Sequence, residues 1–360
     1  MKKLRVGIVY GGRSGEHEIS VTSAGSIFKH IDRAKYEPVA IRIEKDGRWT
    51  LPDQPPMALT AAEVIQQAKT TALGAKGLGG GEPAVLTALN LDVVFPVLHG
   101  PYGEDGTIQG LLELANIAYV GAGVLASAAG MDKSAMKMMF AARGLAVGAW
   151  RGFVRAEWDR DRARVIADVE TLGYPMFVKP ANLGSSVGIS KVKTPADLTP
   201  AIELALEYDR KVVVEAAVPN PREIECSVLG NDDPQASLPG EIVPSREFYD
   251  YEAKYIDDDS KTVIPAELPK DLVTKIQRLS IEAFRAVDCS GLARVDFLLS
   301  RDTGDLSLNE INTMPGFTSI SMYSKMWEAS GLSYAALVDR LIQLGLERHQ
   351  QKQRLKTSFV

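Results

Sequence analysis

The chain has 360 residues, of which 45% are hydrophobic and 24% charged, and its formal net charge is -5. These totals are typical of a globular protein with two or three domains. The acidic balance argues against general nucleic-acid binding, which needs a basic surface. The chain has two cysteines, Cys226 and Cys289, so a disulfide framework is not indicated.

The N-terminus does not have the pattern of a targeting segment. Basic residues precede an apolar run that stops at Gly11, which is too short for a signal peptide. No later apolar stretch approaches the length of a membrane span. We therefore expect a cytoplasmic protein that does not bind membranes.

The first part of the chain predicts a βαβ unit. A strand at 4–10 precedes a glycine-rich turn, a helix with apolar positions from 19 to 31, and a strand at 39–43. Such sheets bind ligands beyond the carboxyl ends of their strands. A dinucleotide fingerprint fails because Tyr10 takes the place of its first glycine. Glu16 suits either the helix dipole or a ligand's ammonium group, and both interpretations stay open.

His99 follows a third predicted strand, at 91–98, and precedes a helix at 108–115. An isolated histidine is usually structural, but the carboxyl end of a strand equally suits contact with a ligand. A glycine pair at 121 and 123 looks like a hinge. The first domain is therefore predicted to span 1–122.

The next block predicts an α+β domain over 123–215, with Lys133 opening its first helix. Lys179 lies on a strand that runs into a loop of small residues, 181–186. Unobstructed backbone amides beside a lysine suit a triphosphate, although a plain hairpin turn and solvated lysines are the alternative. A P-loop is excluded because its glycine and lysine spacing occurs nowhere.

The strongest chemical pattern lies on two alternating runs joined by a short turn near Thr303, which predict a β-hairpin. Side chains two apart share a face, so Arg294 lies with Asp296, Glu310 lies with Asn312, and the two acids face each other. Facing carboxylates repel unless a cation separates them. Magnesium shared with nucleotide phosphates would do so, whereas a solvated charged strand face is the alternative.

The remaining block, 216–360, is predicted to be a third domain. Its segment 245–262 is charged, rich in tyrosine and long for a connector, which favours a mobile lid. Disorder is the alternative, and the aromatic residues argue against it. A helix at 271–287 leads into the hairpin, and a helix capped by Ser333 closes the fold.

Six motifs in this order resemble those of the D-alanine:D-alanine ligases of bacterial cell-wall synthesis, members of the ATP-grasp group. They are GGRSGEHEIS (11–20), HG with GEDG (99–106), MDK (131–133), GSSVG (184–188), FYDYEAKY (248–255) and NEINTMPG (309–316). The resemblance covers essentially the whole chain. It implies an α/β protein in which an N-terminal parallel, Rossmann-like sheet precedes a two-domain ATP-grasp fold of α+β type.

The resemblance also implies the activity, which is ligation of two D-alanines with ATP through an acyl phosphate, releasing ADP and phosphate for peptidoglycan precursors. Two magnesium ions, or manganese, and a homodimer are implied as well. A D-alanine:D-lactate or D-alanine:D-serine ligase is the alternative within the class. A catalytically idle binding protein with the same fold is the alternative outside it.

The resemblance assigns roles to particular residues. Nucleotide contacts are implied for Lys133, Lys179, Ser186, Glu215, Val218, Glu223 and Lys254, and metal ligands for Asp296, Glu310 and Asn312. Glu16 is implied to bind the ammonium group of the first D-alanine. Ser185 and Tyr255 are implied to join Glu16 through hydrogen bonds across the lid, and His99 is implied to lie near the same substrate. The oxyanion is assigned to Arg294 and Gly316, and the second substrate's carboxylate to Ser321.

Overall fold

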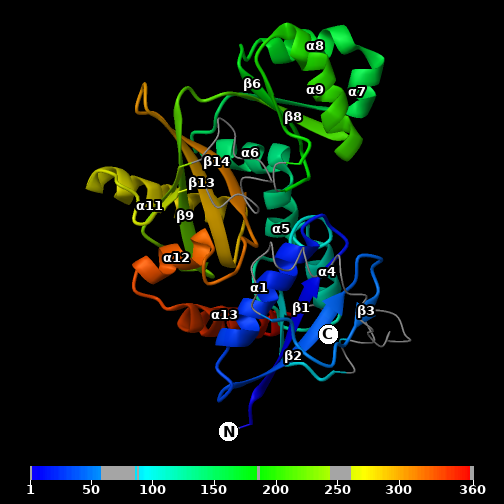
Figure 1. Ribbon diagram of the computed structural model, residues 1–360, viewed down its shortest axis with the longest axis vertical. Helices are drawn as coiled ribbons and strands as arrows, with labels where there is room; N and C mark the ends of the chain where they lie inside the picture. Colours follow the sequence, from blue (N-terminus) through cyan, green and yellow to red (C-terminus); the bar gives the residue numbers. More distant parts are fainter. Residues whose placement is uncertain (1, 58–85, 87–88, 185–186, 244–260, 357–360) are drawn as a thin grey trace.

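The computed structural model describes residues 2–57, 86, 89–184, 187–243 and 261–356, which form three sheets with helices packed on them (Figure 1). The predicted mixed α/β class is confirmed. The described helices include none that is long and apolar enough to cross a membrane.

The N-terminal sheet has the order β3-β2-β1-β4. Its central strands are parallel and β3 is an antiparallel edge. The strands are β1 (Leu4–Gly11), β2 (Tyr36–Ile43), β3 (Trp49–Thr50) and β4 (Val93–Pro96), and the helices are α1 (His17–His30) and α4 (Thr107–Leu114). Because strand side chains alternate, Ile8 packs in the core with α1 and Val9 in the core with α4. The carboxyl ends of β1 and β4 therefore meet at one edge, where Glu16 and His99 follow them.

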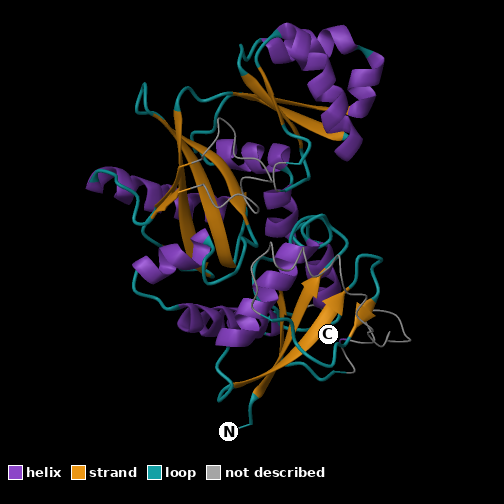
Figure 2. Ribbon diagram, viewed as in Figure 1, coloured by secondary structure: helices purple, strands orange, loops and turns teal. Residues whose placement is uncertain are grey.

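The second sheet is antiparallel with the order β5-β8-β6-β7 (Figure 2). Its strands are β5 (Trp150–Val154), β6 (Met176–Pro180), β7 (Ser190–Val192) and β8 (Lys211–Ala216), and its helices are α7 (Arg155–Arg160), α8 (Arg162–Glu170) and α9 (Pro195–Tyr208). These helices share one core with the sheet, in which Trp158 is fully buried. The opposite face carries Lys179 and Glu215 on neighbouring strands.

The third sheet is also antiparallel, with the path β12-β11-β9-β13-β14 and β10 paired to β9. Its strands are β9 (Pro221–Gly230), β10 (Gln235–Ala236), β11 (Gly240–Val243), β12 (Lys261–Val263), β13 (Gly291–Ser300) and β14 (Leu306–Asn312). The helices in this part are α5 (Val124–Met131), α6 (Lys133–Ala142), α11 (Lys270–Ala286) and α12 (Met322–Ala329). Met136 and Phe140 of α6 share the core of this sheet with α11. The predicted domain boundaries at 122 and 215 stay predictions.

The C-terminal helix α13 (Tyr334–Gln353) packs against the N-terminal sheet, as Figure 1 shows. Leu337 and Leu341 are buried with Ile8, and Ser333 caps the helix through the backbone N–H of Ala336, as the sequence predicts. Arg348 donates hydrogen bonds to carbonyl groups at the predicted hinge. The last helix therefore holds the first and third sheets together.

Candidate active site

The predicted hairpin is formed by β13 and β14, and Asp296 pairs with Glu310 as expected. The register shifts just after Asp296, where a β-bulge lies at Asn309. Val295 and Phe297 point into the apolar core beneath, at 0% and 1% exposure. The acids therefore share the opposite face, which looks toward the second sheet.

Arg294 lies at the centre of this face. Its guanidinium donates from Nε and Nη2 to the two carboxylate oxygens of Asp296, both at 2.7 Å, and lies 3.2 Å from Glu225 on β9. Burial by itself lowers the pKa of Arg294, but Asp296 and Glu225 outweigh it and raise the pKa well above its usual value. We call Arg294, Asp296 and Glu225 the hairpin cluster. The sequence predicts a metal ion beside the two acids, and the structure also places the guanidinium of Arg294 against Asp296.

The oxygen donors of the hairpin fit a hard divalent cation. Asp296 and Glu310 supply carboxylates, and Asn312 supplies an amide oxygen that accepts from the backbone N–H of Met314 at 3.0 Å. Among the described residues no group of three or more His, Cys, Asp and Glu forms a metal cluster. Magnesium that is shared with substrate phosphates is usually held by one or two protein carboxylates, and the hairpin offers two.

A second buried ion cluster lies on the facing sheet. Lys179 on β6 donates to Oε2 of Glu215 on β8 at 2.9 Å, and Lys137 on α6 lies 3.3 Å from Oε1 of the same carboxylate. Burial by itself raises the pKa of Glu215, but Lys179 and Lys137 lower it to about 2. We call Lys137, Glu215 and Lys179 the lysine triad.

Three further residues predicted to contact the nucleotide lie near the lysine triad or just after β8. Lys133 is buried at the start of α6 and donates to the carbonyl of Leu183 at 2.6 Å, in the small-residue loop. Burial by itself lowers the pKa of Lys179, but Glu215, then Glu310 and Glu223 on β9, raise it above its usual value. Val218 is half-buried just after β8. The described residues predicted for the nucleotide therefore lie where the second sheet meets α6 and the third sheet.

Glu16 occupies the N-cap position of α1 but makes no capping hydrogen bond with its side chain. A β-carbon built on Gly100 would lie 2.7 Å from its Oε2 atom, and one built on Gly184 would lie 3.0 Å away. The two glycines therefore give the carboxylate room between the first and second sheets. The N-cap position also suits the helix-dipole interpretation, so both interpretations of Glu16 stay open.

His99 is buried and joins the first sheet to the segment after β14. Its Nδ1 lies 3.0 Å from the carbonyl of Met314 and its Nε2 lies 3.3 Å from Oγ of Ser23. A carbonyl only accepts, so Nδ1 carries the proton and Ser23 donates to Nε2. Burial lowers the pKa of His99, which keeps the ring neutral, although Glu16 opposes this shift. Both ring nitrogens are engaged, which gives His99 a structural role beside its predicted one.

Ser321 lies at the N-terminus of α12. Its hydroxyl lies 2.7 Å from that of Thr318 and accepts from the backbone N–H of Thr318 at 3.1 Å. A β-carbon on Gly316 would lie 3.5 Å from the same hydroxyl. Gly316 and Ser321 therefore lie together at the end of the hairpin. Ser185, Ser186, Lys254 and Tyr255 lie outside the described residues, as does the predicted lid up to residue 260; residues 261 and 262 belong to β12.

Three buried charged residues near the site, Lys137, Glu225 and Glu104, were not predicted from the sequence. For Lys137 and Glu225, their spacing from a predicted residue could have indicated them. Lys137 lies four residues after Lys133 and so on the same helix face. Glu225 lies two residues after Glu223 and so on the same strand face. Glu104 accepts from the backbone N–H of Gly100 at 2.5 Å, and burial, then Glu16, raises its pKa well above the usual value. No spacing rule singles out Glu104.

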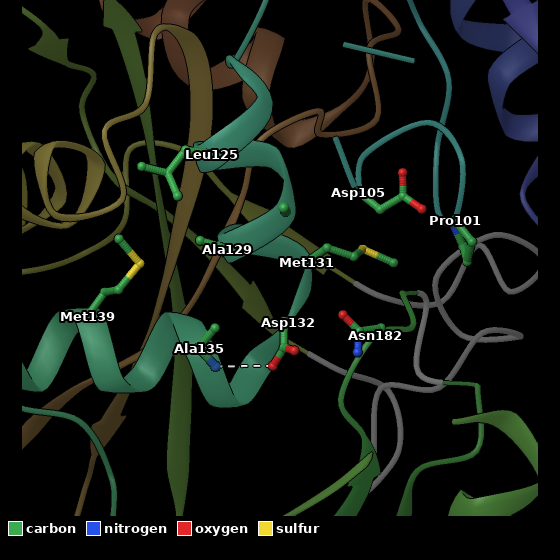
Figure 3. Close-up of a pocket in the computed structure, with 10 residues that line it drawn as sticks. Pro101, Asp105, Leu125, Ala129, Met131, Asp132, Ala135, Met139 and Asn182 are labelled. Atoms are coloured by element: carbon green, nitrogen blue, oxygen red, sulfur yellow. Dashed lines mark hydrogen bonds between the residues drawn. The ribbon is translucent and has the colours of Figure 1, made fainter. Parts of the chain in front are cut away.

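A pocket of about 590 Å³ lies next to these groups (Figure 3). Met131, Leu125 and Met139 give it an apolar wall, and Asp132 lies at its edge, where it caps α6 through the backbone N–H of Ala135 at 3.1 Å. It contains none of the predicted site residues. The pocket therefore borders the site and does not define it.

An N-terminal parallel sheet followed by two antiparallel sheets that face each other with buried lysines and acids defines the ATP-grasp class of fold. Residues 5–122 match the model of the D-ala D-ala ligase N-terminus, and residues 139–343 match that of the D-ala D-ala ligase C-terminus. The chain belongs to the D-alanine–D-alanine ligase family.

Individual relatives agree with this assignment. A D-alanine–D-alanine ligase of Natranaerobius thermophilus is 50% identical over 100% of this chain and 99% of its own length, and one of Heliobacterium modesticaldum is 50% identical over 99% and 98%. The solved D-alanine-D-alanine ligase of Coxiella burnetii superimposes with a TM-score of 0.82 at 40% identity, covering 98% of this chain and 97% of that one. VanG D-Ala:D-Ser ligase of Enterococcus faecalis has a TM-score of 0.82 at 34% identity, covering 96% and 100%.

Proposed function

We propose that the protein joins two D-alanines at the expense of ATP, giving D-alanyl-D-alanine, ADP and phosphate. One observation carries the proposal: the lysine triad, which has two ammonium groups to one carboxylate, contacts the acid-rich hairpin through Lys137 and the carbonyl of Asn309, and Glu16 lies beside Gly184 of the small-residue loop. Phosphates suit the first region and a divalent cation suits the second. Relatives of nearly the same length carry the printed name of this activity.

The reaction follows from the chemistry of the groups. A carboxylate is a poor electrophile, so the γ-phosphoryl group of ATP is transferred to the carboxylate of the first D-alanine, with ADP leaving. Lys133 and Lys179 neutralise phosphate charge by position, assisted by Lys254. Glu16 holds the ammonium group of this substrate, with Ser185 and Tyr255 joining it and His99 nearby. Ser186, Glu215, Val218 and Glu223 complete the nucleotide contacts.

The second step is attack on the acyl phosphate by the neutral amine of the second D-alanine, whose carboxylate Ser321 binds. The amine loses a proton, the C–N bond forms and inorganic phosphate leaves. Arg294 and the backbone N–H of Gly316 stabilise the oxyanion of the tetrahedral intermediate. Acyl phosphates hydrolyse readily, so a lid over 245–260 would have the purpose of excluding water.

The hairpin would hold the metal through Asp296, Glu310 and Asn312. When bound there, magnesium, or manganese in its place, supplies neutralisation of charge on the phosphates. We further propose two such ions, a homodimer and a cytoplasmic location, in line with the family resemblance.

The direct test is to incubate the protein with ATP and magnesium and to follow phosphate release with D-alanine, D-serine and D-lactate side by side. We expect D-alanine-dependent release and a dipeptide product, and we expect a chelator to abolish both. The absence of D-alanine-dependent release would favour an idle binding protein. Light scattering of the same sample tests the dimer.

D-alanine:D-serine ligation is the second candidate, because VanG D-Ala:D-Ser ligase shares this fold over nearly the whole chain at 34% identity. Dipeptide identity in the side-by-side assay decides between the two. A D-lactate product is disfavoured by Tyr255, since such ligases usually replace the lid tyrosine. We expect Tyr255→Phe to raise ester formation with D-lactate relative to dipeptide, whereas an unchanged product ratio would contradict this role.

A further inference from the structure

Lys137 is the least expected member of the lysine triad. Lysine is almost never fully buried unless it is paired, yet this side chain on α6 is 2% exposed. Burial of an ammonium group is costly, so its surroundings must compensate the charge. The residues around Lys137 therefore indicate what its charge does.

Lys137 contacts two different parts of the fold. Its ammonium lies 3.3 Å from Oε1 of Glu215 on β8 and donates to the carbonyl of Asn309 on β14 at 3.4 Å. Lys179 occupies the other carboxylate oxygen, Oε2, at 2.9 Å. The two lysines therefore do not compete for one oxygen, and Lys137 links the second sheet to the hairpin.

The charges of the lysine triad do not cancel, because two ammonium groups share one carboxylate. Lys179 interacts electrostatically with Glu215, and also with Glu310 and Glu223. A phosphate that draws Lys179 away from Glu215 would leave that carboxylate buried without charge compensation if Lys137 were absent. Such an uncompensated buried charge is strongly unfavourable.

We propose that Lys137 is a positioning residue for the nucleotide: it holds the Glu215 carboxylate in place and keeps its charge compensated, so that Lys179 is free to turn to the phosphates. This inference rests on the proposed function, in which ATP lies between the two sheets. Lys137 acts through Glu215 and need not touch the nucleotide. It follows that its removal weakens nucleotide binding more than it affects D-alanine.

The test compares Lys137→Met with the matched exposed variant Lys275→Met, using steady-state kinetics and calorimetry with magnesium-ADP. We expect Lys137→Met to raise the KM for ATP and the Kd for magnesium-ADP by at least about tenfold, with the KM for D-alanine within about twofold. Lys275→Met leaves all three unchanged. Unchanged nucleotide constants in a folded Lys137→Met protein would overturn the proposal.

A double-mutant cycle separates positioning from direct contact. In a Glu215→Gln background the carboxylate charge is gone, so we expect Lys137→Met to add less than about threefold to the Kd for magnesium-ADP. A full tenfold effect in that background would overturn the role through Glu215. If circular dichroism shows that Lys137→Met is unfolded, Lys137→Gln, which keeps a hydrogen-bond donor without the charge, takes its place with the same expected result.

The two hypotheses fail in different ways. The proposed function fails if the wild-type protein shows no D-alanine-dependent phosphate release. The role of Lys137 fails if the wild type is active and the variant keeps its affinity for nucleotide. Calorimetry gives the second answer without any turnover.

Discussion

The lysine triad and the hairpin cluster are both buried sets of three charged groups, but the signs of their net charges are opposite. In the triad, Lys137 and Lys179 share the carboxylate of Glu215, whereas in the hairpin cluster Asp296 and Glu225 share one guanidinium. Glu310 adds a further carboxylate beside the hairpin cluster. Counted within each set, the lysine triad therefore has one surplus positive charge and the hairpin cluster has one surplus negative charge.

The difference shows how a buried cluster indicates its ligand. A closed structural ion pair balances its own charge, because desolvation penalises any surplus. A buried cluster with a net charge is instead expected where a ligand of the opposite charge binds and compensates that charge. By this argument the triad suits an anion such as phosphate and the hairpin suits a divalent cation.

The largest effect on activity is expected from a substitution in the acid-rich hairpin. Glu310→Gln removes one of the two hairpin carboxylates proposed to hold the metal, so we expect the kcat of phosphate release to fall by about 1,000-fold or more. The fold should persist, because Glu310 points away from the apolar core. Circular dichroism and thermal melting check the fold, and the exposed variant Glu207→Gln is the matched control. Near-normal phosphate release would remove Glu310 from the metal site.

Arg294→Lys tests the centre of the hairpin cluster. Lysine keeps the charge but loses the planar fork that binds both oxygens of Asp296, so we expect kcat to fall by about 100-fold. Single-turnover measurements separate the chemical step from product release. A kcat within threefold of the wild type would exclude the proposed oxyanion role of Arg294.

The pH dependence of the free energy of unfolding tests the lysine triad. The expected effect is smaller than the effects on kcat. Glu215→Gln keeps an acceptor for the lysines but loses the charge, so we expect a cost of about 2 kcal/mol in the free energy of unfolding at pH 7. The pKa of Glu215 is about 2 in the folded chain, below its ordinary 4.5, so its contribution is complete above pH 4.5 and is lost as the pH falls toward 2. The difference between wild type and variant should therefore narrow below pH 4.5.

Urea unfolding of both proteins at pH 7, 5 and 3.5 measures this narrowing. Other acids titrate in the same range, but they do so in both proteins and cancel in the difference. A difference that stays constant from pH 7 to pH 3.5 would mean that Glu215 is not held ionised by the lysines.

The sequence by itself determined the features that depend on neighbours along the chain. Alternation and a short turn were enough to pair Asp296 with Glu310 and to bury Val295, because strand geometry is local. The same holds for the helix capped by Ser333. The six motifs supplied the family, which the comparisons confirm.

Tertiary structure alone decided which distant charges meet. Glu225 reaches Arg294 because β9 lies beside β13, and Lys137 reaches Glu215 because α6 packs on β14 next to the second sheet. Glu16 comes close to Gly184 only when the first and second sheets are assembled. Charge compensation acts through space and depends on burial, so spacing along the chain could find the acids but not their partners.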